Sequence, residues 1–214
     1  MKIGIIGTGI VGQTLGTGLI GVGHEVKMGS RHADNPKVQE WVSTAGDKAS
    51  AGTFAEAAQF GEVVFLCTLW HGTEHALRLA EPHHLAGKVV VDVTNPLNFD
   101  SGGPELAVGF SDSAGEMVQR WLPTSHVVKA LNIVTAKLMV NPGSLGEMPD
   151  MFICGNDDFA KRTVGEILAG FGWPPPIDMG GIQEARLIEP LGMIWIKYFM
   201  SVQSGNHAFK LIRK

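Results

Sequence analysis

The sequence predicts an α/β protein with a doubly wound parallel sheet and a small C-terminal helical extension. Three observations predict this class. Short apolar runs alternate with helical patterns along most of the chain. A glycine-rich turn, Gly7 to Gly12, joins the first apolar run to the first helical pattern. The run 62–68 is apolar almost throughout, as in a parallel strand that is buried on both faces.

The predicted strands alternate with predicted helices in chain order. Strand patterns lie at 2–6, 24–28, 62–68, 88–92, 126–130 and 151–154. Helical patterns lie at 10–22, 36–45, 53–60, 72–80, 113–121 and from about 157 to 169. Local signals support several of these boundaries. Pro36 fits a first helical position, Thr53 and Glu56 have the spacing of a capping box, and Asp157 fits a helix cap.

The prolines at 174–176 break the chain, and we expect the boundary between two parts after residue 181. Residues 1–181 hold the alternating pattern, and right-handed crossovers would place all their strands parallel. Residues 182–214 read as helical to the end, with a kink or break near Pro190. We expect this extension to complete a ligand crevice or to form a dimer surface.

Composition excludes several classes of function. The 214 residues carry a net charge of −4, and there is no basic stripe for nucleic acid or anionic lipid. The most apolar window, 191–200, is too short to cross a bilayer. The two cysteines lie in apolar runs and indicate a reducing compartment, so we expect a cytoplasmic protein. His83 and His84 follow Glu81 and Pro82 in a loop, where we expect no metal.

The residues Gly7, Thr8, Gly9, Ile10, Val11 and Gly12 form a G-x-G-x-x-G motif. It follows a strand and opens a helix, which is the setting of a dinucleotide-binding Rossmann unit. Gly7 permits the turn, Gly9 lets the backbone approach a pyrophosphate, and Gly12 lets helix and strand pack closely. Free N–H groups at the helix start would meet the anion. The alternative is a tight strand–helix turn that binds nothing.

The end of the second strand predicts NADP rather than NAD. An acidic residue there would bind the ribose 2′-hydroxyl, but the first acid is Asp34. Ser30 can donate a hydrogen bond to a 2′-phosphate, Arg31 supplies a guanidinium, and Lys37 offers a third contact. The alternative for Arg31 is a solvated loop charge.

Several blocks resemble the NADP reductases that use coenzyme F420, a deazaflavin. They are also similar to the cytosolic NADPH-oxidoreductase domain of the six-transmembrane metalloreductases. The matching blocks are 7–12, 29–31, 91–95, 128–132, 154–158 and 188–191. The resemblance implies an NADP-dependent oxidoreductase that transfers hydride between NADP(H) and a flat partner ring. The partner ring would be F420 or a flavin (FMN or FAD), since Asn132 and the block 91–95 lie nearer the metalloreductase domain.

The resemblance also implies positions for site residues. Asn95, Pro96 and Leu97 would lie beside the nicotinamide and the partner ring, and Asn132 and Ala136 would flank the carboxamide. Thr68, Leu69 and Trp70 would line the dinucleotide path. The same resemblance implies that the C-terminal helices help to form the crevice, and we expect a homodimer.

No residue is assigned as a certain catalytic acid or base. Hydride transfer between two bound rings needs stacking and exclusion of water more than a proton donor. Lys129 and Asn132 resemble the base arrangement of hydroxyacid dehydrogenases, but their spacing differs. Two other functions stay open: a non-catalytic NADPH sensor, and an NADPH-dependent reductase of a small imine or carbonyl substrate.

Overall fold

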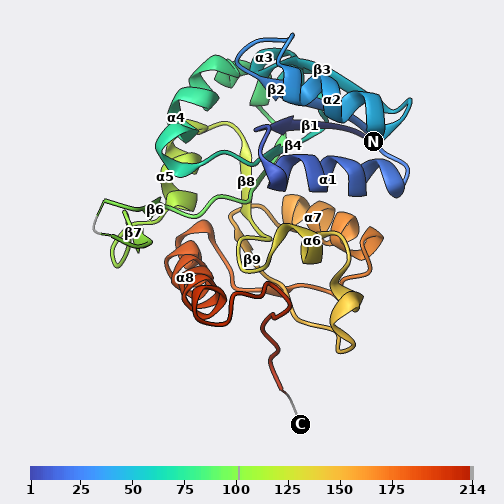
Figure 1. The fold of residues 1–214 in the computed structure, drawn as a ribbon. Helices are drawn as coiled ribbons and strands as arrows, with labels where there is room; N and C mark the ends of the chain where they lie inside the picture. The colour runs from blue at the N-terminus through green and yellow to red at the C-terminus, as the bar shows by residue number, and fades with distance from the viewer. Residues whose placement is uncertain (101, 213–214) are drawn as a thin grey trace.

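The computed structural model describes residues 1–100 and 102–212, and these residues form one large sheet covered by helices on both faces (Figure 1). Among the described residues, eight strands form the large sheet, in the order β10-β9-β8-β5-β4-β1-β2-β3. Their bounds are β1 (Lys2–Ile6), β2 (Glu25–Ser30), β3 (Ala49–Thr53), β4 (Val63–Leu66), β5 (Val89–Asp92), β8 (His126–Lys129), β9 (Phe152–Gly155) and β10 (Ile177–Asp178).

The helices follow the alternation that the sequence predicts. The longer ones are α1 (Ile10–Gly21), α2 (Pro36–Ala45), α3 (Phe54–Phe60), α4 (Trp70–Leu79), α5 (Ala114–Trp121), α7 (Asp158–Gly170) and α8 (Ala185–Val202). Short turns of helix occur at α6 (Ala136–Met139), η1 (Pro82–Leu85), η2 (Pro142–Leu145) and η3 (Ile182–Glu184). Helix α3 begins with the predicted capping box between Thr53 and Glu56. Asp157 caps α7 by accepting a hydrogen bond from the Ala160 amide.

The central strands are parallel, and their side chains form the core. Strand β1 pairs in parallel with β2 and β4, β4 pairs with β5, and β5 pairs with β8. All four residues of β4 and of β5 are buried, because helices cover both faces of the sheet. This arrangement confirms the predicted Rossmann-type α/β class.

Two strands, β9 and β10, depart from the predicted parallel sheet. Strand β9 runs antiparallel to β8, with Val128 opposite Gly155. The segment between these strands, 130–151, contains only the short helices α6 and η2. A parallel connection needs a crossover that brings the chain back to the starting edge, usually a long helix. The chain instead enters β9 from the edge where β8 ends.

Two expectations for the C-terminal extension, a break near Pro190 and a helix to the end of the chain, were wrong for the described residues. Helix α8 runs without a break through Pro190 and ends at Val202, and its C-cap Gln203 has a φ of 52°. Residues 204–212 are not helical: the Asp150 amide donates to the Phe209 carbonyl (2.9 Å), and the Trp195 indole donates to the His207 carbonyl (2.9 Å). Residues 213 and 214 of the expected extension lie outside the described residues.

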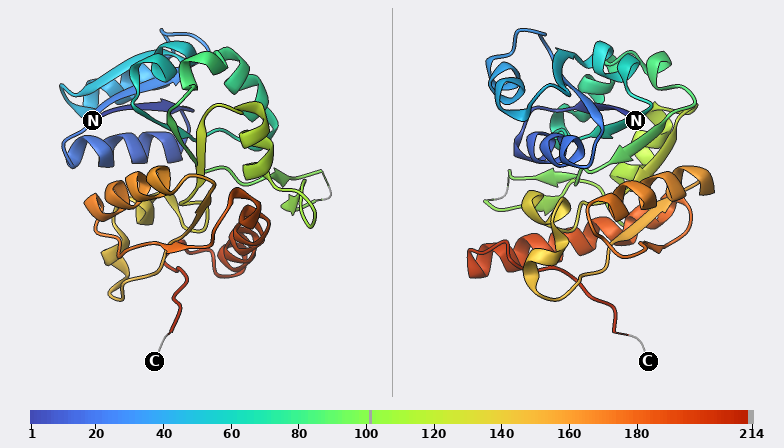
Figure 2. Two further views of the ribbon diagram at one scale, coloured as in Figure 1. Left: turned by 180° about the vertical axis from the view of Figure 1, so that it is seen from behind. Right: turned by 90° about the vertical axis from the view of Figure 1, so that its right-hand side faces the viewer.

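A small antiparallel hairpin, β6 (Leu97–Asn98) and β7 (Glu105–Leu106), projects from the body beside α8 (Figure 2). The hairpin begins at Leu97, five positions after β5 ends at Asp92, so it starts near the edge where the parallel strands end. Among the described helices, none combines the length and the hydropathy needed to span a membrane.

Candidate functional site

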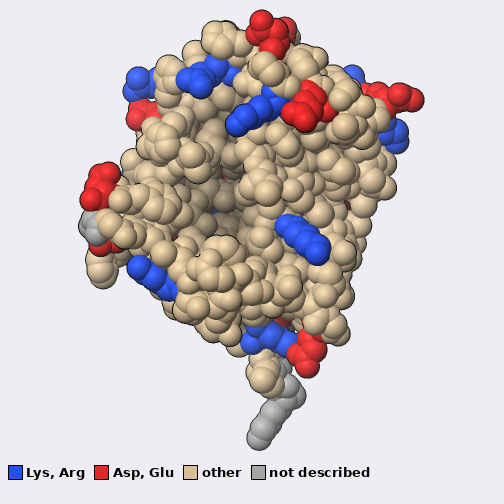
Figure 3. Space-filling model, viewed as in Figure 1, with Lys and Arg blue, Asp and Glu red and all other residues tan. Residues whose placement is uncertain are grey.

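The C-terminal ends of five parallel strands meet at one edge of the sheet. The strand registers align Ile6 with Gly29 and Leu66, Leu66 with Asp92, and Asp92 with Lys129. The residues expected to bind the dinucleotide follow the ends of β1, β2 and β4, and the expected ring-positioning residues follow the ends of β5 and β8. Open parallel sheets bind their ligands at this edge. The molecular surface is hollowed between α1 and the β6–β7 hairpin, and this hollow is the candidate site (Figure 3).

The glycine turn has the steric features of a phosphate-binding loop. Gly7 has a φ of 128°, and a Cβ on it would collide with the Cys67 carbonyl. A Cβ on Gly12 would collide with the Gly7 carbonyl, so α1 packs tightly on the turn. Gly9 differs, because no described heavy atom beyond its chain neighbours lies within 4 Å of where its Cβ would stand. No contact among the described residues requires glycine at position 9, which fits a ligand that approaches the backbone there.

Helix α1 begins at this open position. Gly9 is its N-cap, and no side chain caps it, so the first amide groups remain available to an anion. Ile10 is 77% exposed beside the turn, whereas Val11 packs against the core. The Thr8 carbonyl accepts a hydrogen bond from the Gln13 side chain (3.1 Å), which holds the turn closed from within.

The end of β2 presents two exposed cations, Arg31 and Lys37. Lys37 lies in the first turn of α2, which is capped by Asn35. Ser30 is buried, and its hydroxyl donates to the His32 carbonyl and accepts from the His32 amide. The proton that we expected Ser30 to give to a 2′-phosphate is therefore already used within the loop. In this structure Ser30 shapes the loop that carries Arg31.

The segment after β4 is divided between exposed and packed residues. Leu69 is 73% exposed at the start of α4, and the Thr68 hydroxyl is hydrogen-bonded to the Thr73 hydroxyl (2.8 Å). The Trp70 ring stacks on Trp121 of α5, with ring centroids 5.6 Å apart. Trp70 thus packs between two helices, and Leu69 is the residue of this segment that is open to the site edge.

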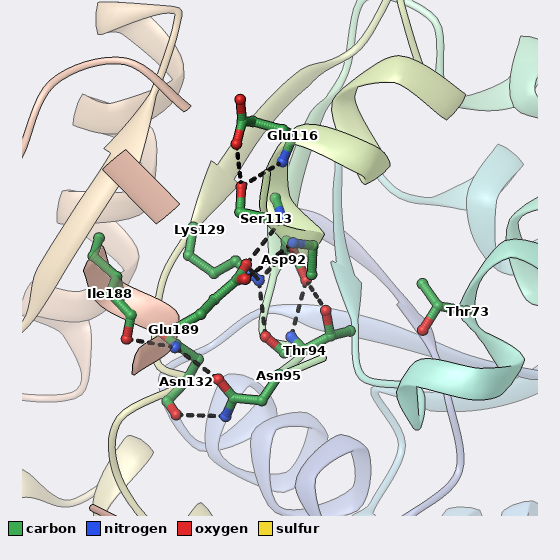
Figure 4. A network of polar contacts seen from close by, with 12 residues as sticks. Thr73, Asp92, Thr94, Asn95, Ser113, Glu116, Lys129, Asn132, Ile188 and Glu189 are labelled. Carbon is green, nitrogen blue, oxygen red and sulfur yellow. Dashed lines mark hydrogen bonds and ion pairs between the residues drawn. The ribbon is translucent and has the colours of Figure 1, made fainter. Parts of the chain in front are cut away.

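A fully buried ion network lies directly behind the edge (Figure 4). Lys129 Nζ at the end of β8 lies 2.7 Å from Asp92 Oδ2 of β5 and 2.9 Å from Glu189 Oε1 of α8. It also donates to the Thr94 carbonyl (2.8 Å). The side chains of Lys129 and Asp92 are completely inaccessible to solvent, and that of Glu189 is 2% exposed.

The remaining carboxylate oxygens of the network are also satisfied. Asp92 Oδ1 accepts from the Thr94 amide (2.9 Å) and hydroxyl (2.7 Å). Glu189 accepts from the first amides of α5, those of Ala114 and Gly115, each at 2.9 Å. A carboxylate is favoured at a helix N-terminus because unpaired N–H groups point at it. Glu189 therefore ties α8 to both α5 and the sheet.

The network fixes the protonation of Lys129. Burial opposes its charge, but Asp92 and Glu189 outweigh this effect and raise the pKa of Lys129 above its usual value. A buried ammonium with a raised pKa cannot act as a base, so the resemblance to hydroxyacid dehydrogenases does not extend to this chemistry. Burial, followed by the charge of Asp92, likewise raises the pKa of the Cys67 thiol far above its ordinary value.

Asn95 and Asn132 are hydrogen-bonded to each other next to this network. Asn95 Nδ2 donates to the Asn132 carbonyl (2.8 Å), and Asn132 Nδ2 donates to Asn95 Oδ1 (2.9 Å) and to the Ile188 carbonyl (3.3 Å). Asn132 is 5% exposed, and its Oδ1 has no hydrogen-bond partner among the described residues. Such an orphaned acceptor fits a ligand that brings an amide donor. The structure therefore brings Asn95 and Asn132 together, as the expected roles require.

The other expected ring-positioning residues lie around this pair. Pro96 is buried, and Leu97 is half-buried where the hairpin begins. Ala136 is buried at the start of α6, which packs against α1. A Cβ on Gly192 would lie 2.8 Å from Asn95 Oδ1, so α8 reaches the asparagines only because it has a glycine there.

The sequence reasoning gave no site role to Glu189 or Gly192. Glu189 lies in the block 188–191 and Gly192 follows that block. The contacts of Glu189 join residues 60 to 75 positions apart, which no local pattern in the sequence reveals. In the structure, the resembling blocks 91–95, 128–132 and 188–191 are parts of one network.

A separate cavity of about 570 Å³ lies away from the motif, near His126 at the start of β8. Its charged residues are already paired: Arg120 with Asp112, and Asp157 with His126 and the Ala160 amide. This cavity contains none of the expected site residues. The candidate site is therefore the strand-end edge rather than this cavity.

Comparisons with known proteins show the family to which the chain belongs. The family model described as "NADP oxidoreductase coenzyme F420-dependent" matches residues 2–96. An F420-dependent NADP reductase from Methanocaldococcus jannaschii is 30% identical over 224 residues, covering 99% of this chain and 98% of that protein. A crystal structure from Arthrobacter sp. FB24, provisionally named an F420-dependent NADP reductase, superposes with a TM-score of 0.93 at 37% identity and covers all of both chains.

A second group of relatives is longer. Metalloreductase STEAP3 from Rattus norvegicus is 34% identical over 193 residues, which is 89% of this chain. The chain spans 36% of the length of that protein.

Proposed function

The chain belongs to the family of coenzyme F420-dependent NADP oxidoreductases, and on that premise we propose that it transfers hydride between NADP(H) and a flat heterocyclic acceptor, F420 or a flavin. The observation that carries the proposal is the pairing of two features at one sheet edge. Gly9 leaves open space at the start of α1, and the orphaned Asn132 Oδ1 lies at the end of β8. One feature suits a pyrophosphate and the other suits a carboxamide.

The chain's residues would bind and orient the dinucleotide. The first amides of α1 would hold the pyrophosphate, and Arg31 and Lys37 would pair with the 2′-phosphate. Asn132 Oδ1 would accept from the carboxamide, which would fix the face that the nicotinamide presents. NADPH supplies the hydride when it is bound. The protein's task is to hold two rings in contact and to exclude water.

The acceptor ring would lie over Asn95, Pro96 and Leu97. Pro96 has no N–H to donate, so the loop can offer a dry surface to a ring. The buried network holds this loop from behind, because Lys129 binds the Thr94 carbonyl and Asp92 binds the Thr94 amide. The β6–β7 hairpin and α8 flank the same position (Figure 1).

We propose that residues 182–214 form an extension that completes this crevice and contributes a homodimer surface. One face of α8 is buried through Ile188, Gly192 and Trp195. The opposite face exposes large apolar side chains, among them Leu187, Ile194 and Tyr198, each more than half exposed. Contiguous exposed apolar residues on one helix favour burial against a partner. The spacings of seven and four residues place these three side chains on one face of α8, and a second copy of the chain would bury that face.

Steady-state oxidation of NADPH with F420, FMN and FAD tests the proposal. We expect turnover with at least one of these rings. Leu97→Asp should reduce that turnover far more than it weakens NADPH binding, because it places a charge on the acceptor side. Leu79→Asp, an exposed position on α4, is the matched control and should leave both unchanged. NADPH binding without turnover on any ring would instead support a sensor, and turnover restricted to imines or small carbonyl compounds would support a small-substrate reductase.

A further inference from the structure

A second cluster of chemistry-bearing side chains lies at the opposite edge of the sheet. Helix α4 follows the C-terminal end of β4 and returns the chain to the edge where β5 begins. The turn η1, between α4 and β5, carries Glu81, His83 and His84. The proposed hydride transfer uses none of these residues.

The three side chains converge. Glu81 Oε2 lies 3.6 Å from His83 Nε2 and 3.5 Å from His84 Nε2, and the three atoms all lie within 4.8 Å of one another. Zinc binds nitrogen and oxygen ligands at about 2.1 Å, so two ligands of a tetrahedral ion stand about 3.4 Å apart. The separations from the carboxylate already match this value without any ion.

The backbone of the turn holds the cluster in place. Helix α4 ends at Leu79 with Ala80 as its C-cap, and the next residue, Glu81, has a φ of 57°, which turns the chain. Pro82 then fixes its own φ, and the His84 amide donates to the Glu81 carbonyl (2.8 Å). Three ligands on one short, constrained turn lose little conformational freedom when they bind an ion.

We propose that Glu81, His83 and His84 form a binding site for a divalent transition metal such as Zn²⁺. Two imidazoles and one carboxylate are a donor set that Zn²⁺ accepts, with a fourth position left to water. The sequence alone predicted no metal here, because adjacent histidines in a loop are common and their convergence on Glu81 cannot be read from spacing. The site is open to solvent at Glu81 and His83, while His84 is more than three-quarters covered.

Zinc titration of the full-length chain by calorimetry at pH 7.5 tests the site. We expect one Zn²⁺ per chain and a higher melting temperature with zinc. The double variant His83→Ala/His84→Ala and the single variant Glu81→Gln should each lower the affinity by more than about tenfold. His75→Ala, which removes an exposed histidine of α4, is the matched control and should bind zinc normally.

Two further readouts separate a metal site from a simple histidine–carboxylate contact. Co²⁺, which reports its ligands through visible absorption, should give bands that the double variant lacks. Mg²⁺, which prefers oxygen ligands, should not displace the bound Co²⁺. The proposal is overturned if the unaltered chain binds no zinc, or if the double variant binds zinc as the unaltered chain does.

Discussion

Lys129 Nζ lies between two carboxylates, 2.7 Å from Asp92 Oδ2 and 2.9 Å from Glu189 Oε1, and all three side chains are buried. These residues come from β8, β5 and α8. The contact therefore joins the end of the parallel sheet to the C-terminal helix. Because Lys129 also holds the Thr94 carbonyl, the same ammonium positions the loop that carries Asn95.

Replacing Lys129 tests the structural role of this network. Lys129→Met would leave two carboxylates buried without their cation, so we expect a loss of about 3–5 kcal/mol in the free energy of unfolding. Urea denaturation measures it. Lys137→Met, at an exposed position of α6, is the control and should change stability little. A Lys129→Met protein as stable as the unaltered chain would show that the network does not hold the fold.

The ion pair between Glu116 and Arg186 predicts a pH dependence. The guanidinium of Arg186 hydrogen-bonds Glu116 and holds the pKa of this carboxyl below its usual value, which burial only partly opposes. A carboxyl whose pKa is lower in the folded state stabilises the fold above its unfolded pKa, about 4.3. That stabilisation is lost as the pH falls through the folded value.

We therefore expect the melting temperature to fall more steeply below about pH 4.3 in the unaltered chain than in Glu116→Gln. Melting curves measured from pH 7 to pH 3 would show this difference. Glu166→Gln, on the exposed side of α7, is the control and should follow the unaltered chain. Parallel curves for the Glu116→Gln variant and the unaltered chain would contradict the assignment.

The two glycines Gly9 and Gly12 should respond differently to substitution. A side chain at Gly9 meets open space, so Gly9→Val should keep the melting temperature and abolish NADPH binding. A side chain at Gly12 would collide with the Gly7 carbonyl, so Gly12→Val should destabilise the protein itself. Fluorescence titration with NADPH and thermal melting separate the two effects. Normal NADPH binding by Gly9→Val would place the pyrophosphate elsewhere.

Arg31 should determine the preference for NADPH. We expect NADPH to bind at least about tenfold more tightly than NADH, because a charged contact with the 2′-phosphate contributes roughly 1.4 kcal/mol or more. Arg31→Ala should remove most of that preference and leave NADH binding nearly unchanged. Arg162→Ala, an exposed arginine on α7, serves as the control. Equal affinities for NADPH and NADH in the unaltered chain would contradict the preference.

The fold was largely predictable because its signals are local. The glycine turn, the apolar runs 62–68 and 88–92 and the capping box of Thr53 each identify an element without knowledge of the rest. Strand β3 was not predicted, since Ala-Ser-Ala-Gly-Thr carries no apolar run. It forms at the edge of the sheet because its backbone pairs with β2, and this pairing outweighs the weak strand propensity of its residues.

The site was predictable only where it follows strand ends. Asn95 and Asn132 follow the neighbouring parallel strands β5 and β8, so both lie at the strand-end edge, where the structure shows them hydrogen-bonded to each other. The engagement of Ser30 with His32, the stacking of Trp70 on Trp121 and the reach of Glu189 to α5 are contacts of tertiary structure. No spacing in the chain specifies them, so they required the structure.

The most direct test of the account is the fate of deuterium placed on one face of the nicotinamide. NADPH carrying deuterium at C4, in either the pro-R or the pro-S position, is oxidised by the chain with the acceptor that supports turnover, and the NADP⁺ is analysed by mass spectrometry. A nicotinamide held by Asn132 presents one face, so the account predicts complete loss of deuterium from one stereoisomer and complete retention in the other. Equal loss from both stereoisomers would contradict hydride transfer within a single oriented site.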